Sequence, residues 1–140
     1  MSTAPKTRGI LETALYCADL GRSHRFYADV IGLSAMLTTP RLVAMDAGAR
    51  GVLLLFQAGA TSEDLPEGDG VIPGHEGAGR LHMAFAIDDA DYEPWKAHFA
   101  ALGLSLAGEV SWPRGGRSLY VRDPDGHAVE FCTPGLWPNG

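Results

Sequence analysis

Three ionisable residues stand at similar places in three stretches that alternate apolar with other side chains: Glu12 in LETALYC, His82 in LHMAFAI and Glu130 in HAVEFC. Residues two apart in a strand face the same side, so each has small nearest neighbours on its face, and bulky residues lie opposite. An imidazole and two carboxylates suit a divalent cation, whereas an unpaired buried charge is costly. Singly, each could be an ordinary core or surface residue, but the joint pattern predicts one metal site.

Two arginines, Arg114 and Arg117, flank a glycine pair in SWPRGGR, just before the hairpin that carries Glu130. Guanidinium groups bind carboxylate and phosphate oxygens well, so both are predicted to receive an anionic group of a substrate. The alternative is an ordinary hairpin loop with solvated arginines.

His75 and Tyr16 complete the set of candidate site residues. His75 lies in the glycine-rich PGHEGAG, and an imidazole gains or loses a proton near neutral pH. Together with Glu130 it is the candidate catalytic residue, acting as an acid or base, and a plain surface histidine is the alternative. Tyr16 shares the strand face of Glu12 and is a candidate for substrate binding, although core packing explains it equally well.

Two halves of similar plan would have to position these residues. The first half is predicted to be strand, helix and strands, over residues 10–20, 21–31, 42–47 and 51–58. The second half repeats the order, with a strand, a helix and a closing hairpin over residues 80–88, 92–102 and 117–132. Asp19 and Asp91 are expected caps of the two helices, and Gly32 and Gly103 their ends.

The connection between the halves is rich in glycine, proline and acids, which predicts a linker or lid. The predicted fold class is therefore α+β, a single domain over residues 9–137. It divides into a module over 9–59, the linker over 60–79 and a second module over 80–137.

Bulk composition excludes several classes of function. With 140 residues and 46% hydrophobic composition the chain can bury one core, and its longest apolar run, VLLLF, is far too short to span a membrane. A net charge of −6 without a basic run argues against nucleic acid and anionic membranes. Cys17 and Cys132 lie inside predicted strands, which favours reduced thiols in a cytoplasmic protein.

The stretches ETALYCADLGRSHRFYADVIGL, LHMAFAI and LYVRDPDGHAVEF resemble the vicinal oxygen chelate superfamily of glyoxalase I, fosfomycin- and bleomycin-resistance proteins and extradiol dioxygenases. The resemblance implies paired βαβββ modules whose mixed sheets curl into a cup around a metal. Its ligand positions fall on Glu12, His82 and Glu130. It also implies a homodimer as partner, in which each site takes Glu12 from one chain and the other two ligands from the second. The long linker could equally leave each site within one chain, and the sequence leaves this choice open.

Two departures from the family narrow the expected chemistry. A set of one histidine and two carboxylates differs from the two-histidine set of ring-cleaving dioxygenases, and Leu54 stands near the place of a fourth ligand in glyoxalase I. The expected cofactor is one Mn, Fe, Zn or Ni ion per site. The expected function is a lyase, isomerase or transferase acting on a small oxygenated metabolite or antibiotic. A ring-cleaving dioxygenase and a metal-free drug-binding protein remain alternatives.

Overall fold

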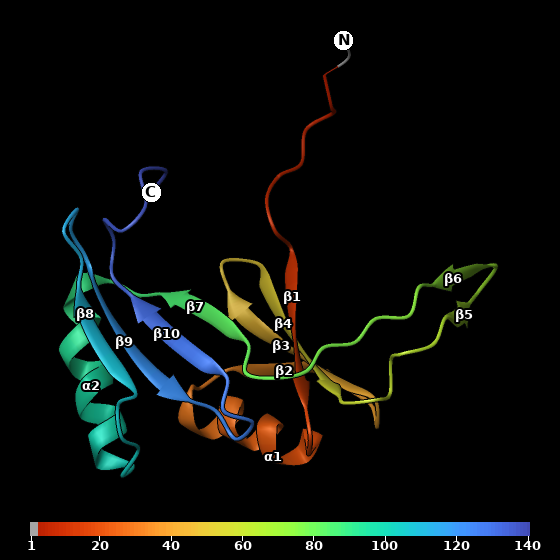
Figure 1. Cartoon of the computed structure of the whole chain (residues 1–140), viewed down its shortest axis with the longest axis horizontal. Coiled ribbons are helices and arrows are strands. Elements are labelled where there is room, and N and C mark those ends of the chain that lie inside the picture. Colours follow the sequence, from red (N-terminus) through yellow and green to blue (C-terminus); the bar gives the residue numbers. More distant parts are fainter. Residues whose placement is uncertain (1–2) are drawn as a thin grey trace.

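Two four-stranded sheets, each with helices on one face, make up most of the computed structural model, which describes residues 3–140 (Figure 1). The first module comprises β1 (Glu12–Cys17), α1 (Leu20–Arg25), a π-helix (Phe26–Val30), β2 (Ser34–Thr38), β3 (Leu42–Gly48) and β4 (Gly51–Gln57). The second comprises β7 (His82–Ala86), a 3-10 helix (Asp89–Asp91), α2 (Tyr92–Ala101), β8 (Gly108–Ser111), β9 (Arg117–Arg122) and β10 (Ala128–Cys132). A short hairpin of β5 (Leu65–Glu67) and β6 (Gly70–Ile72) lies between them.

Both sheets have the same topology, β1-β4-β3-β2 and β7-β10-β9-β8, with the first strand parallel to the last and the others antiparallel. The predicted α+β class with two βαβββ modules is confirmed. The registers also correspond, because Glu130 pairs with Ala84, two residues after His82, and Leu54 pairs with Ala14, two residues after Glu12. Leu54 therefore holds in the first sheet the place that Glu130 holds in the second.

One hydrophobic core joins the helix-bearing faces of both sheets. Its buried members include, from the first module, Leu15, Tyr27, Val43, Met45, Leu53 and Leu55, and from the second, Phe99, Leu119, Val121, Val129 and Phe131. Val30 and His98 also connect the two helical layers, because the carbonyl of Val30 lies 2.8 Å from the His98 ring nitrogen Nε2. Since the modules pack through these faces, the opposite faces of both sheets lie on the outside of the chain, and the linker covers part of that of the first sheet.

The two expected helix caps differ. The Asp19 side chain accepts a hydrogen bond from the backbone N–H of Arg22 at 3.1 Å, as predicted. Asp91 makes no such bond, because it ends a 3-10 turn and its backbone is already helical instead of extended. The first helix also widens into a π-helix after Arg25 before it ends at Gly32, whose φ of +87° suits glycine.

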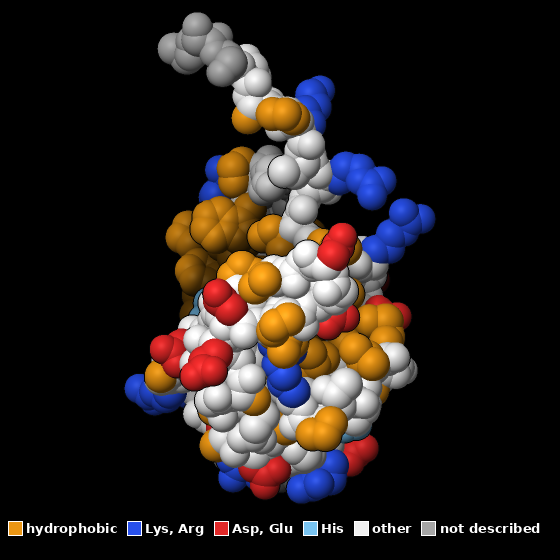
Figure 2. Space-filling model, turned by 90° about the vertical axis from the view of Figure 1, so that its right-hand side faces the viewer, with side chains coloured by type: hydrophobic (Ala, Val, Ile, Leu, Met, Phe, Trp, Pro, Cys, Tyr) orange, Lys and Arg blue, Asp and Glu red, His pale blue; other side chains and the backbone are white. Residues whose placement is uncertain are grey.

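The linker contains a short hairpin that was not predicted from its composition. It forms the hairpin of β5 and β6, which projects from the first module in Figure 1, and then returns along the sheet. Figure 2 looks at the end of the molecule from which the hairpin projects, and hydrophobic side chains are exposed there among acidic and basic ones. Val71 of the hairpin is 61% exposed.

Two expectations from composition can be compared with the structure. Within residues 3–140, every helix is too short or too polar to cross a bilayer. Cys17 and Cys132 are both free thiols. Burial raises the pKa of the Cys17 thiol from 9.0 to about 11, so it stays protonated at neutral pH.

Candidate functional site

His82 and Glu130, two of the predicted metal ligands, contact each other across neighbouring strands. His82 begins β7, Glu130 lies in the neighbouring β10, and the histidine nitrogen Nε2 is 3.3 Å from the carboxylate oxygen Oε1. The other ring nitrogen, Nδ1, lies 2.9 Å from the carbonyl oxygen of Ala128. A carbonyl only accepts, so Nδ1 carries a proton, and in the neutral imidazole Nε2 directs a lone pair at the carboxylate. Two lone pairs that converge in this way suit a bound cation.

The Glu130 carboxylate is held in place from its other side. Although Glu130 is only 5% exposed, its Oε2 accepts a hydrogen bond from the Ser118 hydroxyl. The Ser118 oxygen in turn accepts from the indole N–H of Trp112 at 2.7 Å. Burial and the neighbouring Glu130 raise the pKa of Tyr120, so this phenol remains protonated beside the carboxylate. The chain therefore orients Glu130 so that Oε1 faces His82.

Glu12 lies on the open face of the first sheet and is exposed. It lines a cavity of about 490 Å³ together with Phe56, whereas His82 and Glu130 line a different cavity of about 440 Å³ with Trp137. Within one chain, over residues 3–140, Glu12 is not part of any group of three possible metal ligands. A single chain therefore brings together two of the three predicted ligands.

Tyr16 and His75 come together above the first sheet, on the face that carries Glu12. The Tyr16 hydroxyl lies 2.7 Å from the His75 nitrogen Nδ1, and the phenol ring stacks on Phe56 with centroids 6.0 Å apart. The linker passes close over this tyrosine, since a Cβ built on Gly77 would lie 2.6 Å from its ring. His75 and Glu12 thus line the same cavity, and the catalytic role of His75 stays a prediction.

The two candidate arginines lie in different places: Arg117 on the helix side of the second sheet and Arg114 in an exposed loop. Arg117 points away from Glu130, because it is on the helix side of β9, with its guanidinium 3.9 Å above the Tyr92 ring and paired with Asp89 and Glu93. Strand parity gives the reason, since Ser118 next to it is the residue that faces Glu130. As a correction to the sequence analysis, we no longer place Arg117 in the substrate site. Arg114 is exposed in the β8–β9 loop.

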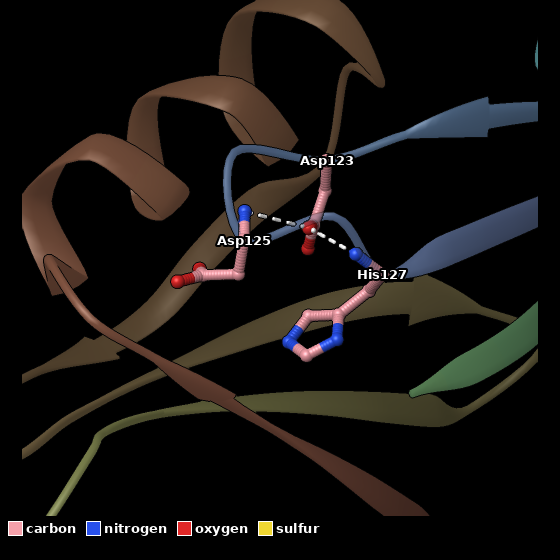
Figure 3. A group of neighbouring side chains, drawn as sticks. All are labelled: Asp123, Asp125 and His127. Carbon is pink, nitrogen blue, oxygen red and sulfur yellow. Dashed lines mark hydrogen bonds between the residues drawn. The ribbon is translucent and has the colours of Figure 1, made fainter. Parts of the chain in front are cut away.

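A second cluster of possible metal ligands is Asp123, Asp125 and His127, at the β9–β10 turn (Figure 3). His127 is 2% exposed, and its Nδ1 accepts from the backbone N–H of Leu81 at 2.8 Å. Its Nε2 then carries the proton and donates to the Tyr16 carbonyl at 3.0 Å. With both ring nitrogens occupied, His127 has no lone pair for a metal.

The two carboxylates of this cluster also accept hydrogen bonds from the protein. Asp123 accepts from the Tyr27 hydroxyl at 2.8 Å, and burial followed by this neighbouring carboxylate raises the pKa of Tyr27 far above its usual range. Asp125 accepts from the Ala18 backbone N–H at 2.9 Å and from the Ser23 hydroxyl at 3.0 Å. The turn of the second module is thus bonded to the first module. We call Asp123, Asp125 and His127 the inter-module clamp.

Sequence reasoning missed Ser118, Trp112 and the clamp, and also Arg41, which lines the cavity of Glu12. Alternation along β9 could have found Ser118, because it has the parity of a residue facing Glu130 across the hairpin. Alternation could not have found Arg41, because it precedes β3 and the turn before the strand decides where its side chain points.

The chain is similar to proteins of one known superfamily. A family model described as Glyoxalase/Bleomycin resistance protein/Dioxygenase superfamily matches residues 9–131. A lactoylglutathione lyase of Haemophilus influenzae is 32% identical over 126 residues, covering 87% of this chain and 90% of that protein. A metallothiol transferase FosB of Staphylococcus saprophyticus is 25% identical over 117 residues, covering 83% and 70%. The crystal structure of a lactoylglutathione lyase from Agrobacterium tumefaciens superimposes with a TM-score of 0.86 at 38% identity, covering 96% and 99%.

Proposed function

The chain belongs to the glyoxalase, bleomycin-resistance and dioxygenase superfamily, and from this we propose that it is a divalent-metal-dependent enzyme of lyase, isomerase or transferase type acting on a small oxygenated molecule. The observation that carries the proposal is the convergence of His82 Nε2 and Glu130 Oε1 at 3.3 Å. The relatives named as a lyase and a metallothiol transferase support the reaction classes.

Glu12, His82 and Glu130 are the proposed ligands. A divalent ion held by them would act as a Lewis acid and keep positions open for two neighbouring substrate oxygens. The two carboxylates favour Mn²⁺ or Fe²⁺, while the imidazole keeps Zn²⁺ and Ni²⁺ possible. His75 is the proposed group that holds or moves a proton, because it lines the cavity of Glu12.

The proposed working form is a homodimer with shared sites. Two exposed apolar residues lie beside the open faces: Leu37 on β2 is 52% exposed and Trp137 near the carboxyl end is 68% exposed. Leu37 pairs with Ala44, which pairs in turn with Leu54 on the Glu12 face of the first sheet. If the first sheet of one protomer covers the second sheet of its partner, these apolar residues become buried and Glu12 approaches His82.

The first test is metal binding. Protein stripped with a chelator, reloaded with Mn²⁺ or Zn²⁺ and freed of excess ion is expected to retain about one equivalent per chain. His82→Ala removes the lone pair that faces Glu130, so this variant should retain almost none by elemental analysis. His24→Ala, on the first helix, is the matched control. Full retention of the ion by His82→Ala would contradict the proposal.

The hydroxyl of Ser118 should matter for the same measurement. Ser118→Ala removes the hydrogen bond that orients Glu130, and loss of such a supporting bond typically weakens metal binding about 10- to 100-fold. Ser111→Ala changes an exposed serine of the neighbouring strand and should bind metal like wild type. Equal dissociation constants for both variants, from competition with a fluorescent chelator, would show that Ser118 does not position the ligand.

A further inference from the structure

The cavity that Glu12 lines also contains apolar side chains, a guanidinium group and an imidazole. Its volume is about 490 Å³, and its apolar lining includes Phe56, which is 5% exposed, and Leu54. Arg41 and His75 line the same cavity. Both gather around Phe56, because the guanidinium carbon lies 6.0 Å from the centroid of that ring and the imidazole centroid 4.7 Å from it.

Arg41 is half-buried, and no side chain within residues 3–140 forms an ion pair with it. Among residues 3–140, the ion pairs of the chain involve other cations, so the guanidinium has no carboxylate partner. Its backbone is fixed, since its N–H donates to the Thr39 hydroxyl oxygen at 3.2 Å and its carbonyl accepts from the Gln57 N–H at 2.9 Å. An unpaired guanidinium on an anchored backbone, 6.0 Å from the centroid of an apolar ring, suits an anion, because it donates several hydrogen bonds at once.

His75 is fixed at the edge of the same ring. Its backbone N–H donates to the Thr61 carbonyl at 2.7 Å, and the Thr61 hydroxyl donates to its carbonyl at 2.6 Å. The Tyr16 hydroxyl is the better donor in its 2.7 Å contact with Nδ1, which leaves the imidazole proton on Nε2. His75 therefore offers one N–H donor in addition to the donors of Arg41.

We infer that Arg41, supported by His75, forms an anion-binding subsite, so that the substrate carries a carboxylate or phosphonate-like group at the end remote from its metal-binding oxygens. The inference rests on the proposed function, in which Glu12 is occupied by the cation and no longer opposes an anion. An apolar stretch of the substrate then lies over Phe56. The substrate class is a small organic acid with two neighbouring oxygens at one end and a separate anionic group at the other.

A pair of probe molecules tests the subsite. 2-Oxoglutarate has two neighbouring oxygens and a distal carboxylate, and 2-oxopentanoate has the same chain without that carboxylate. Calorimetric titration of the Mn²⁺-loaded wild type should show that 2-oxoglutarate binds at least about tenfold more tightly than 2-oxopentanoate. Arg41→Gln should remove this difference and leave the binding of 2-oxopentanoate and the metal content unchanged. Arg25→Gln, on the exposed side of the first helix, is the control.

Several outcomes would overturn the inference. They are equal binding of the two acids by wild type, no binding of either, or a preference for 2-oxoglutarate that survives in Arg41→Gln but disappears in Arg114→Gln. His75→Ala should weaken the binding of 2-oxoglutarate by a few-fold and leave the binding of 2-oxopentanoate unchanged. Metal content separates this inference from the proposed function. If wild type retains no ion, the proposed function fails, whereas intact metal content without discrimination between the acids contradicts only the subsite.

Discussion

Replacing Asp123 with alanine is expected to lower the free energy of unfolding by about 3 kcal/mol, a large share of the stability of a domain this size. Asp123 is 5% exposed and accepts three hydrogen bonds, from the Tyr27 hydroxyl at 2.8 Å and from the backbone N–H groups of Asp125 and His127 at 3.0 and 2.9 Å. Alanine would leave these donors buried without an acceptor. That penalty exceeds the gain from no longer burying the carboxylate.

Urea unfolding followed by circular dichroism measures this effect. Asp123→Asn keeps one acceptor oxygen and should lose less stability than Asp123→Ala. Asp69→Ala, in the exposed turn of the β5–β6 hairpin, is the matched control and should stay within about 0.5 kcal/mol of wild type. If Asp123→Ala is as stable as this control, the clamp does not hold the modules together.

The clamp matters because it fixes the orientation of the two modules, and therefore of their outer sheet faces, relative to each other. Asp125 and His127 bond the turn of the second module to the β1 end of the first, through Ala18 and the Tyr16 carbonyl. Tyr16 itself contacts His75 in the cavity of Glu12. Loosening the turn should therefore disturb the first module's cavity as well as overall stability, and the geometry of any shared site depends on the clamp.

Strand periodicity was sufficient to predict much of the fold and part of the site. A period of two in LHMAFAI and HAVEFC placed His82 and Glu130 each on the strand face with small neighbours, and the parallel pairing of their strands brings them into contact. The closing hairpin predicted over residues 117–132 is present as β9 and β10, and Gly126 in its turn has the positive φ of +83° that suits glycine. These features are local, so residue spacing determines them.

Features that depend on distant contacts could not be predicted. Arg117 looked like a loop residue free to bind substrate, but α2 supplies Tyr92 and two acids on its side of the sheet. Composition indicated a linker or lid but not its course, whereas the structure shows that Thr61 and His75 fix its return across the first sheet. The metal ligand role of Glu12 stays a prediction, because a single chain does not complete the site.

Subunit mixing should restore metal binding to a pair of defective variants, which is the sharpest test of a shared site. Glu12→Lys puts a cation where the ion would lie, and His82→Ala removes a ligand, so each homodimer should retain almost no metal. In a mixed dimer with shared sites, one site collects both defects. The other takes Glu12 from one chain and His82 and Glu130 from its partner, and is wholly wild type.

The amount of metal recovered is itself predicted. Random exchange in an equal mixture makes half of the dimers mixed, and each mixed dimer has one intact site of two, so about a quarter of the wild-type capacity should return. Native mass spectrometry of differently tagged chains measures the exchange, and elemental analysis measures the ion. Each variant exchanged with itself is the control. If every site lay within one chain, each would keep a defect and the mixture would remain empty. An empty mixture with complete exchange would therefore rule out the shared site, because every mixed dimer with shared sites contains one wholly wild-type site.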